Sequence, residues 1–268
     1  MPREVPKISV VTPSFNQARY LERTILSVLE QAYPRLEYII VDGGSTDGSQ
    51  DIIRKYSNHL AWWVSEPDRG QAHAINKGLQ RSTGDWLAWQ NSDDVYYPGA
   101  FESLARASAA HPDVALVIGN VNLIDGADRV LRDLCFVRPT LNALLAEGMV
   151  LTNQAAFWRR GVHEQIGWLN ESLHCAFDYD WFLRLLETGR AAHVNRCWGG
   201  YRLHEETKTT IINDRCQKER KTVLAGRGLP RWKIALYQSR RLLLLLAQGR
   251  IGYVLRGLFE RVTSRKRI

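Results

Sequence analysis

Several features that identify common protein classes are missing from this chain of 268 residues. The segment after the first expected strand has neither a G-x-G-x-x-G nor a Walker pattern, which argues against a dinucleotide or P-loop site. No uninterrupted apolar run reaches the roughly eighteen residues that a membrane-spanning helix needs. The first residues run into a strand pattern without an apolar signal segment. Because both phosphate-binding patterns are missing, any diphosphate bound here is expected to be held through a metal.

Cysteine is scarce, and the few cysteines are widely scattered. No C-x-x-C pair occurs among the four, which are Cys135, Cys175, Cys197 and Cys216. Such an arrangement is typical of reduced thiols in a cytoplasmic protein rather than of a disulfide framework or a zinc site.

Acidic residues are nearly absent from the end of the chain. Residues 227–268 contain eleven Lys or Arg and one acid, Glu260, so they carry a charge of +10. The preceding 226 residues carry −2, which together with the tail gives the net charge of +8. A body of this charge argues against nucleic acid as a partner and indicates a separate function for the tail.

Strands and helices are expected to alternate through the first half. The expected strands are 8–12, 37–42, 60–64, 85–90 and 114–121, and the helices between them are 20–31, 50–56, 71–80 and 98–110. This alternation predicts an α/β fold with a mostly parallel sheet and helices on both faces. Further along we expect an antiparallel strand at 130–137, mainly helical structure at 139–189, extended structure at 191–203 and helices from 214 onward.

Polar segments follow four of the predicted strands, each just past the strand end. They are Thr-Pro-Ser-Phe-Asn at 12–16, Asp-Gly-Gly-Ser-Thr-Asp at 42–47, Ser-Glu-Pro-Asp-Arg-Gly at 65–70 and Asn-Ser-Asp-Asp at 91–94. One polar turn usually has only a structural role, but the ends of parallel strands meet at one edge, where such folds bind ligands. Clustered carboxylates suit Mg²⁺ or Mn²⁺, which are often held by one or two carboxylates plus substrate phosphates.

In this order the four segments resemble the family 2 glycosyltransferases, inverting enzymes of the GT-A fold. The resemblance covers about residues 7–210. It implies a catalytic domain over 1–212, with a nucleotide-binding half at 7–125 and an acceptor half at 126–212. A helical basic tail would follow at 213–268.

The resemblance also implies residues for the donor nucleotide, with Asp42 and Asp68 holding the nucleoside. The expected set is Thr12, Pro13, Asn16, Asp42, Gly44, Asp68, Gln71, Asn91 and Ser92. The family's D-x-D motif binds the divalent cation, Mn²⁺ or Mg²⁺. Asn91 replaces the first acid of that motif, so Asp93 should carry most of the metal ligation, with Asp94 nearby and His204 as a further ligand.

A second motif lies further along, where Phe177-Asp178 stands in place of the family's Glu-Asp pair. Inverting sugar transfer needs a carboxylate to take the proton of the acceptor hydroxyl, and a helix start tends to keep a carboxylate ionised. Asp178 is the predicted base and Asp180 its rival, although Asp178 could simply cap the helix.

Other polar residues fall near these motifs. Arg202 or Lys208 is expected to neutralise the leaving diphosphate. Asn153 and Gln154, with Asp180, are expected beside the acceptor or the donor sugar.

The tail contains two apolar helical stripes flanked by arginine. Either these helices pack on the catalytic domain, or they form a basic anchor on an anionic membrane surface. We expect the anchor, through residues 230–268, in a cytoplasmic protein that is peripheral on the inner face of the cell membrane.

The expected function is metal-assisted transfer of a sugar in polysaccharide biosynthesis. The donor would be UDP-, GDP- or dTDP-linked, and the acceptor would be a hydroxyl of a glycan or a lipid-linked sugar. A nucleotidyltransferase that makes sugar nucleotides should carry a Gly- and Arg-rich loop after the first strand, which is missing here. A non-catalytic, membrane-associated sugar-binding protein is disfavoured by the set of intact acids Asp42, Asp68, Asp93 and Asp178.

Overall fold

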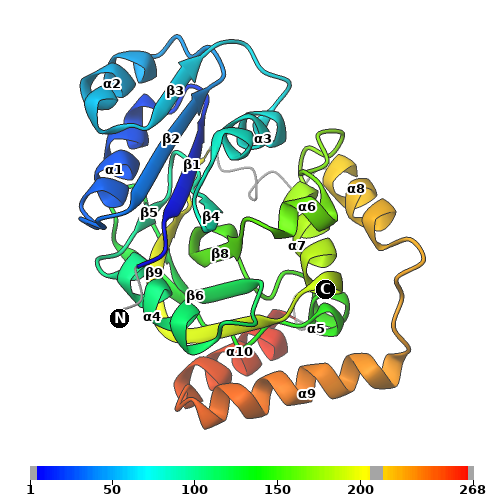
Figure 1. Cartoon of the computed structure of the whole chain (residues 1–268). Helices are drawn as coiled ribbons and strands as arrows, with labels where there is room; N and C mark the ends of the chain where they lie inside the picture. Colours follow the sequence, from blue (N-terminus) through cyan, green and yellow to red (C-terminus); the bar gives the residue numbers. More distant parts are fainter. Residues whose placement is uncertain (1–4, 206–213, 265–268) are drawn as a thin grey trace.

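The structure, a computed structural model, describes residues 5–205 and 214–264 (Figure 1). Its centre is a nine-stranded mixed sheet in the order β3-β2-β1-β4-β8-β6-β9-β5, with β7 paired to β6. Helices cover this curled sheet, as expected for the α/β class (Figure 1).

The first half of the sheet is parallel, as predicted. β1 (Ile8–Ser14), β2 (Leu36–Asp42), β3 (Trp62–Ser65) and β4 (Trp86–Trp89) lie side by side, with β1 between β2 and β4. Their connections contain α1 (Ala18–Leu29), α2 (Ser49–Tyr56), the 3-10 turn η1 (Ser57–His59) and α3 (Gln71–Arg81). All seven residues of β1 are buried, because helices cover both faces of this part of the sheet.

The second half of the sheet is mixed. It comprises β5 (Val95–Tyr96), β6 (Leu116–Ile124), β7 (Val130–Leu134), β8 (Ala156–Arg159) and β9 (Ala191–Arg202). β8 runs antiparallel to both β4 and β6, whereas β9 runs parallel to β6. The helices are α4 (Ala100–Ala110), α5 (Leu141–Glu147), α6 (Val162–Ile166) and α7 (Phe177–Thr188), with the 3-10 turn η2 (Asn153–Ala155) before β8.

Two short strands were not predicted. β8 interrupts the segment 139–189, which was expected to be mainly helical, and β5 has only two residues. The predicted antiparallel strand at 130–137 ends earlier, at Leu134. β5 pairs with β9, and β8 pairs with β4 and β6, so both strands depend on distant segments that the local pattern does not reveal.

Aromatic side chains fill the core where the two halves meet. Trp89 of β4 lies 5.2 Å from Trp158 and 5.8 Å from Phe182 between ring centroids. Trp158 also meets Trp181 at 5.7 Å. These large buried rings join β4, β8 and α7 and so fix the start of α7 relative to the parallel strands.

The C-terminal part is helical, as predicted, and consists of α8 (Asp214–Leu224), α9 (Arg231–Ala247) and α10 (Ile251–Ser264). In Figure 1, α9 and α10 lie along the edge of the molecule formed by α5 and β6. A small separate core holds them there, made by Cys135, Val137, Leu245 and Val254. No helix among the described residues is long and apolar enough to cross a membrane. The predicted domain boundary at 212/213 falls outside the described residues and stays a prediction.

The expectation that all four cysteines are reduced thiols is wrong for one pair. Cys175, just before α7, and Cys216 of α8 form a disulfide, whereas Cys135 and Cys197 are free. The bonded residues are 41 positions apart. Their proximity depends on how α8 docks on α7, and spacing in the sequence could not show it.

Candidate donor and acceptor site

A cavity of about 940 Å³ opens beside the carboxyl ends of the parallel strands. The parallel half of the fold contributes Pro13, Gly43, Asp68, Gln71, Asn91, Ser92 and Asp93 to its wall. The other half contributes Met149, Asn153, Gln154, His174, Asp178, Tyr179 and Arg220. The predicted convergence of polar segments at one sheet edge therefore produces a real cavity.

Asp42 lies beneath the loop that follows β2, not in the cavity wall. Its carboxylate is fully buried and accepts hydrogen bonds from the Gly44 amide, from the Ser45 amide and hydroxyl, and from the Ser65 hydroxyl. Gly44 has a φ of 84°, which favours glycine at this turn. Asp42 therefore shapes the loop, and the structure does not place it against a nucleoside as the resemblance implied.

Asp68, in contrast, reaches the cavity. One of its carboxylate oxygens accepts a 2.7 Å hydrogen bond from the Gly70 amide. The other lies 2.7 Å from the point where Gly43 would carry a Cβ. A side chain at position 43 would displace this carboxylate, so the glycine keeps Asp68 exposed to the cavity.

In the segment that follows β1, residues 12–16, some side chains line the cavity and others only support the loop. Pro13 lines the cavity, whereas Thr12 is buried with its hydroxyl 3.0 Å from the Tyr38 hydroxyl. Asn16, at a φ of 51°, accepts a hydrogen bond from the Thr46 amide and stays outside the wall.

Asp94 is a buried structural carboxylate. It accepts hydrogen bonds from the Asn91 amide group (2.9 Å), the Gln154 amide group (2.7 Å) and the Arg202 backbone amide (2.8 Å). Burial raises the pKa of Asp94 well above its ordinary value, and the neighbouring Asp93 raises it further, against the effect of these hydrogen bonds. With both oxygens occupied, Asp94 does not fit the metal-ligand role expected for it.

Asn91 has a clear place in this network. Its side-chain oxygen accepts a hydrogen bond from Gln71, and its amide group donates to Asp94. The residue that departs from the family's D-x-D pattern thus joins the cavity wall to the buried acid.

Asp93 and His204 form the candidate metal pair. The Asp93 carboxylate faces the cavity, and one of its oxygens lies 2.9 Å from Nε2 of His204. The imidazole lies just behind the wall, with its ring centroid 4.9 Å from that of Tyr20. Among the described residues no group of three possible metal ligands occurs. One carboxylate and one imidazole fit a cation that takes its other ligands from a bound diphosphate.

Arg202 is not free to bind a diphosphate. Its side chain is 1% exposed and donates hydrogen bonds to the backbone carbonyls of Asp93 and Asp125. It also pairs with Asp128 and lies 4.8 Å from the Tyr20 ring centroid. Arg202 therefore holds the backbone at Asp93 and Asp125 in place, and the expected diphosphate contact does not fit this environment. Lys208 lies outside the described residues.

Asp178 and Asp180 have different environments although both lie in the first turn of α7. Asp178 lines the cavity. Asp180 is not in the wall, and its carboxylate pairs with Arg184 at 2.9 Å. Of the two acids, Asp178 is the one that lines the cavity.

Asn153 and Gln154 both line the cavity from η2, where they were expected to meet a sugar. Within the described residues, Nδ2 of Asn153 and Oε1 of Gln154 are buried without a hydrogen-bond partner. Buried polar atoms usually have one, so the hydrogen bonding of these two amides is incomplete.

Helix α8 contributes to the site in a way that the sequence did not reveal. Arg220 lines the cavity, while the neighbouring Glu219 binds the backbone before α7. The sequence assigns this helix to the tail, because a polar, charged helix carries no signal of the surface on which it packs.

Comparison with known proteins identifies the family of the chain. The profile named "Glycosyl transferase family 2" matches residues 9–167, more than half of the chain. The chain belongs to glycosyl transferase family 2. It is 34% identical over 152 residues to an uncharacterised glycosyltransferase of Nostoc sp., covering 56% of this chain and 47% of that one. It is 28% identical over 235 residues to the chondroitin synthase of Pasteurella multocida, covering 87% of this chain. The chain spans about half the length of the first relative and 24% of the second.

Solved structures of GT-A glycosyltransferases share this fold. Residues 1–349 of S. aureus TarS in complex with UDP-GlcNAc superpose with a TM-score of 0.68 at 18% identity, covering 82% of this chain and 66% of that one. The Pyrobaculum calidifontis mannosyltransferase PcManGT, in complex with GDP-Man and Mn²⁺, gives 0.60 at 21% identity, covering 98% and 81%. The GT-A fold expected from the sequence is thereby confirmed.

Proposed function

We propose that this protein is an inverting glycosyltransferase that moves a sugar from a nucleoside-diphosphate donor to a hydroxyl of a glycan. The observation that carries the proposal is one cavity whose wall combines Asp68, Asp93 and Asp178 from three separate segments. A nucleoside site, a diphosphate site and a base are the three things that this reaction requires.

In this reaction each of these residues has a separate role. Asp68 and Gln71 hold the donor nucleotide, and Asn153 and Gln154 meet sugar hydroxyls. Asp178 takes the proton as the acceptor oxygen bonds to the anomeric carbon, and the bond from that carbon to the diphosphate oxygen breaks. Attack from the face opposite the leaving group inverts the configuration.

A divalent cation would be held by Asp93 and His204. When bound, such an ion neutralises the charge that develops on the leaving diphosphate. The Mn²⁺ in the mannosyltransferase complex supports this assignment. Asp94, Asn91 and Arg202 keep Asp93 in place through the buried network beneath it.

The donor proposal is tested by titrating UDP-, GDP- and dTDP-sugars with and without Mn²⁺. We expect metal-dependent binding of one nucleotide, and loss of the metal-dependent part in Asp93→Ala. The matched control is Asp51→Ala, which removes an exposed acid of α2. If no nucleotide binds with metal present, the glycosyltransferase proposal fails. If Asp93→Ala binds as tightly as the wild type, the metal assignment fails.

The acceptor proposed is a growing glycan or a lipid-linked sugar, in polysaccharide biosynthesis. The chondroitin synthase among the relatives supports a glycan. A lipid-linked acceptor is supported by the outer surface of α9 and α10, which we propose docks on an anionic membrane.

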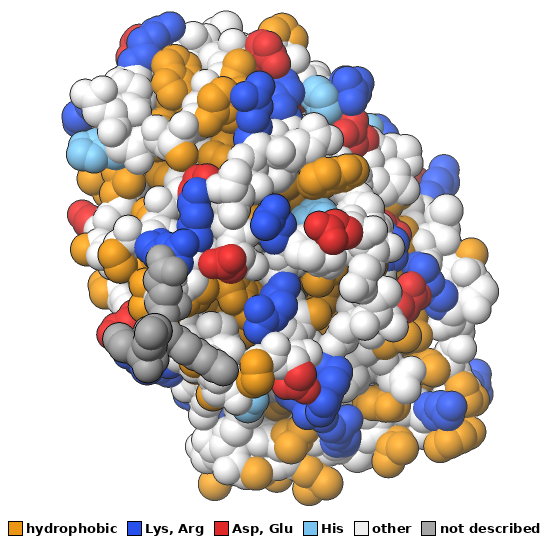
Figure 2. All heavy atoms as spheres, viewed as in Figure 1, with side chains coloured by type: hydrophobic (Ala, Val, Ile, Leu, Met, Phe, Trp, Pro, Cys, Tyr) orange, Lys and Arg blue, Asp and Glu red, His pale blue; other side chains and the backbone are white. Residues whose placement is uncertain are grey.

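That surface has an apolar stripe, the outer stripe, formed by Trp232, Leu236, Leu243 and Leu246 of α9, continued on α10 by Ile251 and Leu255. All six are exposed, by 42% (Leu246) to 67% (Leu243). The four residues of α9 share one helix face, and Arg231, Arg240 and Arg256 are also exposed. In Figure 2 basic and apolar side chains lie together along this edge of the molecule. Apolar side chains flanked by cations fit an anionic lipid surface.

Docking is tested with vesicles of phosphatidylcholine, with and without phosphatidylserine. We expect binding only when phosphatidylserine is present, and a loss of about tenfold or more when Leu236 and Leu243 are both changed to Glu. Leu131→Glu, at an exposed position of β7, is the control. Equal binding by the double variant would rule out the stripe.

On the inner face of a cell membrane, reducing conditions would hold Cys175 and Cys216 as thiols.

A further inference from the structure

Arg220 is the one Lys or Arg in the described wall of the cavity, which also contains three acids. Its side chain is exposed, and no Asp or Glu of the described chain forms an ion pair with it. A cation that pairs with no acid of the described residues and faces a cavity requires an explanation beyond packing.

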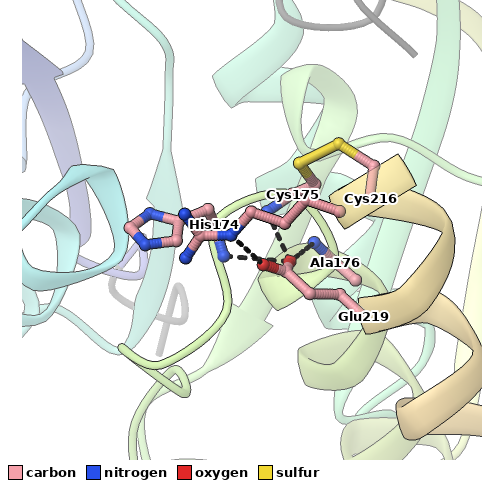
Figure 3. Close-up of a disulfide and its surroundings, with 6 residues drawn as sticks. His174, Cys175, Ala176, Cys216 and Glu219 are labelled. Carbon is pink, nitrogen blue, oxygen red and sulfur yellow. Dashed lines mark hydrogen bonds and ion pairs between the residues drawn. A yellow bond between two sulfur atoms is a disulfide. The ribbon is translucent and has the colours of Figure 1, made fainter. Parts of the chain in front are cut away.

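Helix α8 is fixed firmly beside the start of α7. One carboxylate oxygen of Glu219 accepts hydrogen bonds from three successive backbone amides, those of residues 174, 175 and 176, at 3.0, 2.8 and 3.2 Å. Figure 3 shows these contacts next to the Cys175–Cys216 disulfide, which joins the same two segments. Glu219 is 9% exposed, so the cap is largely shielded from water. Arg220, the next residue, is therefore presented to the cavity from a fixed helix.

The contacts of Arg220 place it on the acceptor side. Its guanidinium carbon lies 5.5 Å from the centroid of the Tyr179 ring, and Tyr179 follows the proposed base Asp178. On its other side, Nη2 lies 2.6 Å from where Gly148 would carry a Cβ. Both neighbours belong to the half of the fold that contains α5 and α7. The residues proposed for the nucleotide lie on the opposite wall, at the ends of β1 to β4.

We propose that Arg220 binds an anionic group of the acceptor, a carboxylate or a phosphate, next to the hydroxyl that Asp178 deprotonates. This inference rests on the proposed function and names the class of acceptor: a sugar that carries a negative charge. A guanidinium has a planar set of donors that matches either anion with two parallel hydrogen bonds. Packing against an aromatic ring and a glycine keeps that plane fixed and reduces the entropy lost on binding.

The test measures the binding of three small sugars to the full chain, with and without the nucleotide and Mn²⁺. Glucuronic acid supplies a carboxylate, glucose 1-phosphate supplies a phosphate, and glucose supplies neither. We expect the wild type to bind at least one of the charged sugars about tenfold or more tightly than glucose. Arg220→Gln should abolish that preference, and Arg220→Lys should restore part of it. The sugar that shows the preference identifies the anion.

Lys221→Gln is the matched control, because it removes the same charge from an exposed neighbour outside the cavity wall. It should keep the preference. Equal binding of charged and neutral sugars by the wild type would overturn the proposal. So would weakened nucleotide binding in Arg220→Gln, because Arg220 would then serve the donor diphosphate. Failure of the wild type to bind any nucleotide is a separate result, which counts against the proposed function. The sugar titration without nucleotide still decides the role of Arg220.

Discussion

Asp93 and Asp94 are neighbours in the sequence but face opposite environments. Asp93 faces the cavity, whereas Asp94 is completely buried and accepts three hydrogen bonds. The same contrast separates Asp178 from Asp180, and Asp68 from Asp42. In each pair one acid faces the substrate cavity and the other supports the protein around it.

The contrast between the two acids of α7 leads to a prediction. Asp178→Asn should lower the rate of sugar transfer by about 10²–10⁴-fold, because the variant cannot accept the proton. The affinity for the nucleotide sugar should remain close to that of the wild type. Asp180→Asn keeps the cavity wall intact and should retain most of the activity. Steady-state transfer rates of both variants test the assignment of the base. Equal losses of rate in the two variants would contradict it.

A second prediction concerns the buried His163. Its Nε2 accepts a hydrogen bond from Trp158, and Nδ1 lies 3.0 Å from the Gly167 carbonyl oxygen. Burial lowers the pKa of His163 to about 4, from an ordinary value of 6.5. The neutral ring stabilises the fold above pH 6.5, and this stability is lost as the pH falls towards 4, because only the unfolded chain takes up the proton.

Over that range the loss from His163 should reach about 3 kcal/mol. Burial also lowers the pKa of His193 to about 4, so a second histidine acts in the same window. Urea unfolding of the wild type and of His163→Gln at pH 7 and pH 4.5 measures the effect. The free energy of unfolding of the variant should fall by about half as much between the two pH values. An unchanged pH dependence would show that His163 does not contribute.

At the level of single residues, the sequence identified the cavity acids but not their supports. Asp68 and Asp93 lie in segments whose order along the chain already predicted them at one sheet edge, and Asp178 lies in a separate motif predicted at the start of a helix. Whether an acid faces the cavity or lies beneath it depends on partners far away in the sequence. Asp94, for example, is held by Gln154 and by the backbone of Arg202, and neither is visible from the Asn-Ser-Asp-Asp segment.

Among the elements, α8 differs most from its predicted role. It was expected to begin the tail, yet its Glu219 caps the backbone that leads into α7. The parallel strands and their helices were predicted because long periodic segments carry a strong signal. β5 and β8 were missed because their pairing depends on β9, β4 and β6 rather than on local sequence.

The cap formed by Glu219 supports a third prediction. Glu219→Ala leaves three backbone amides without their carboxylate, so the free energy of unfolding should fall by about 2–3 kcal/mol. Transfer activity should fall as well, because Asp178 begins the same helix. Glu219→Gln keeps a hydrogen-bond acceptor and should lose less. Chemical denaturation compares both with Glu164→Ala, an exposed acid of α6. A loss no larger than that of Glu164→Ala would rule out the cap.

For the molecule as a whole, the sequence left two alternatives for the C-terminal helices, packing on the catalytic domain or anchoring on a membrane. The structure has one face of these helices packed and another exposed. Their inner face packs on the protein through Leu245, which is 1% exposed, whereas Leu243 of the outer stripe is 67% exposed. Arg241 and Tyr237 also bond to Glu147 and Asn142 of α5. Packing on the domain is therefore present, and the outer face remains available.

These two faces should respond differently to the same substitution. Leu245→Ala should lower the free energy of unfolding by about 2–5 kcal/mol, because it leaves a cavity in the small core. Leu243→Ala should change it by about 0.5 kcal/mol or less, and should instead weaken binding to phosphatidylserine vesicles. Denaturation and vesicle sedimentation of both variants measure the two effects. A large stability loss from Leu243→Ala would show that the outer stripe is covered.

The bond between Cys175 and Cys216 also closes a covalent ring. Asp178, all of β9 and His204 lie within it, so the proposed base and one of the two proposed metal ligands belong to one closed loop of the chain. A single proteolytic cut between residues 176 and 215 would yield two fragments that stay joined until the disulfide is reduced. Gel electrophoresis with and without reductant would therefore report directly whether α8 is tied to α7 in a given preparation.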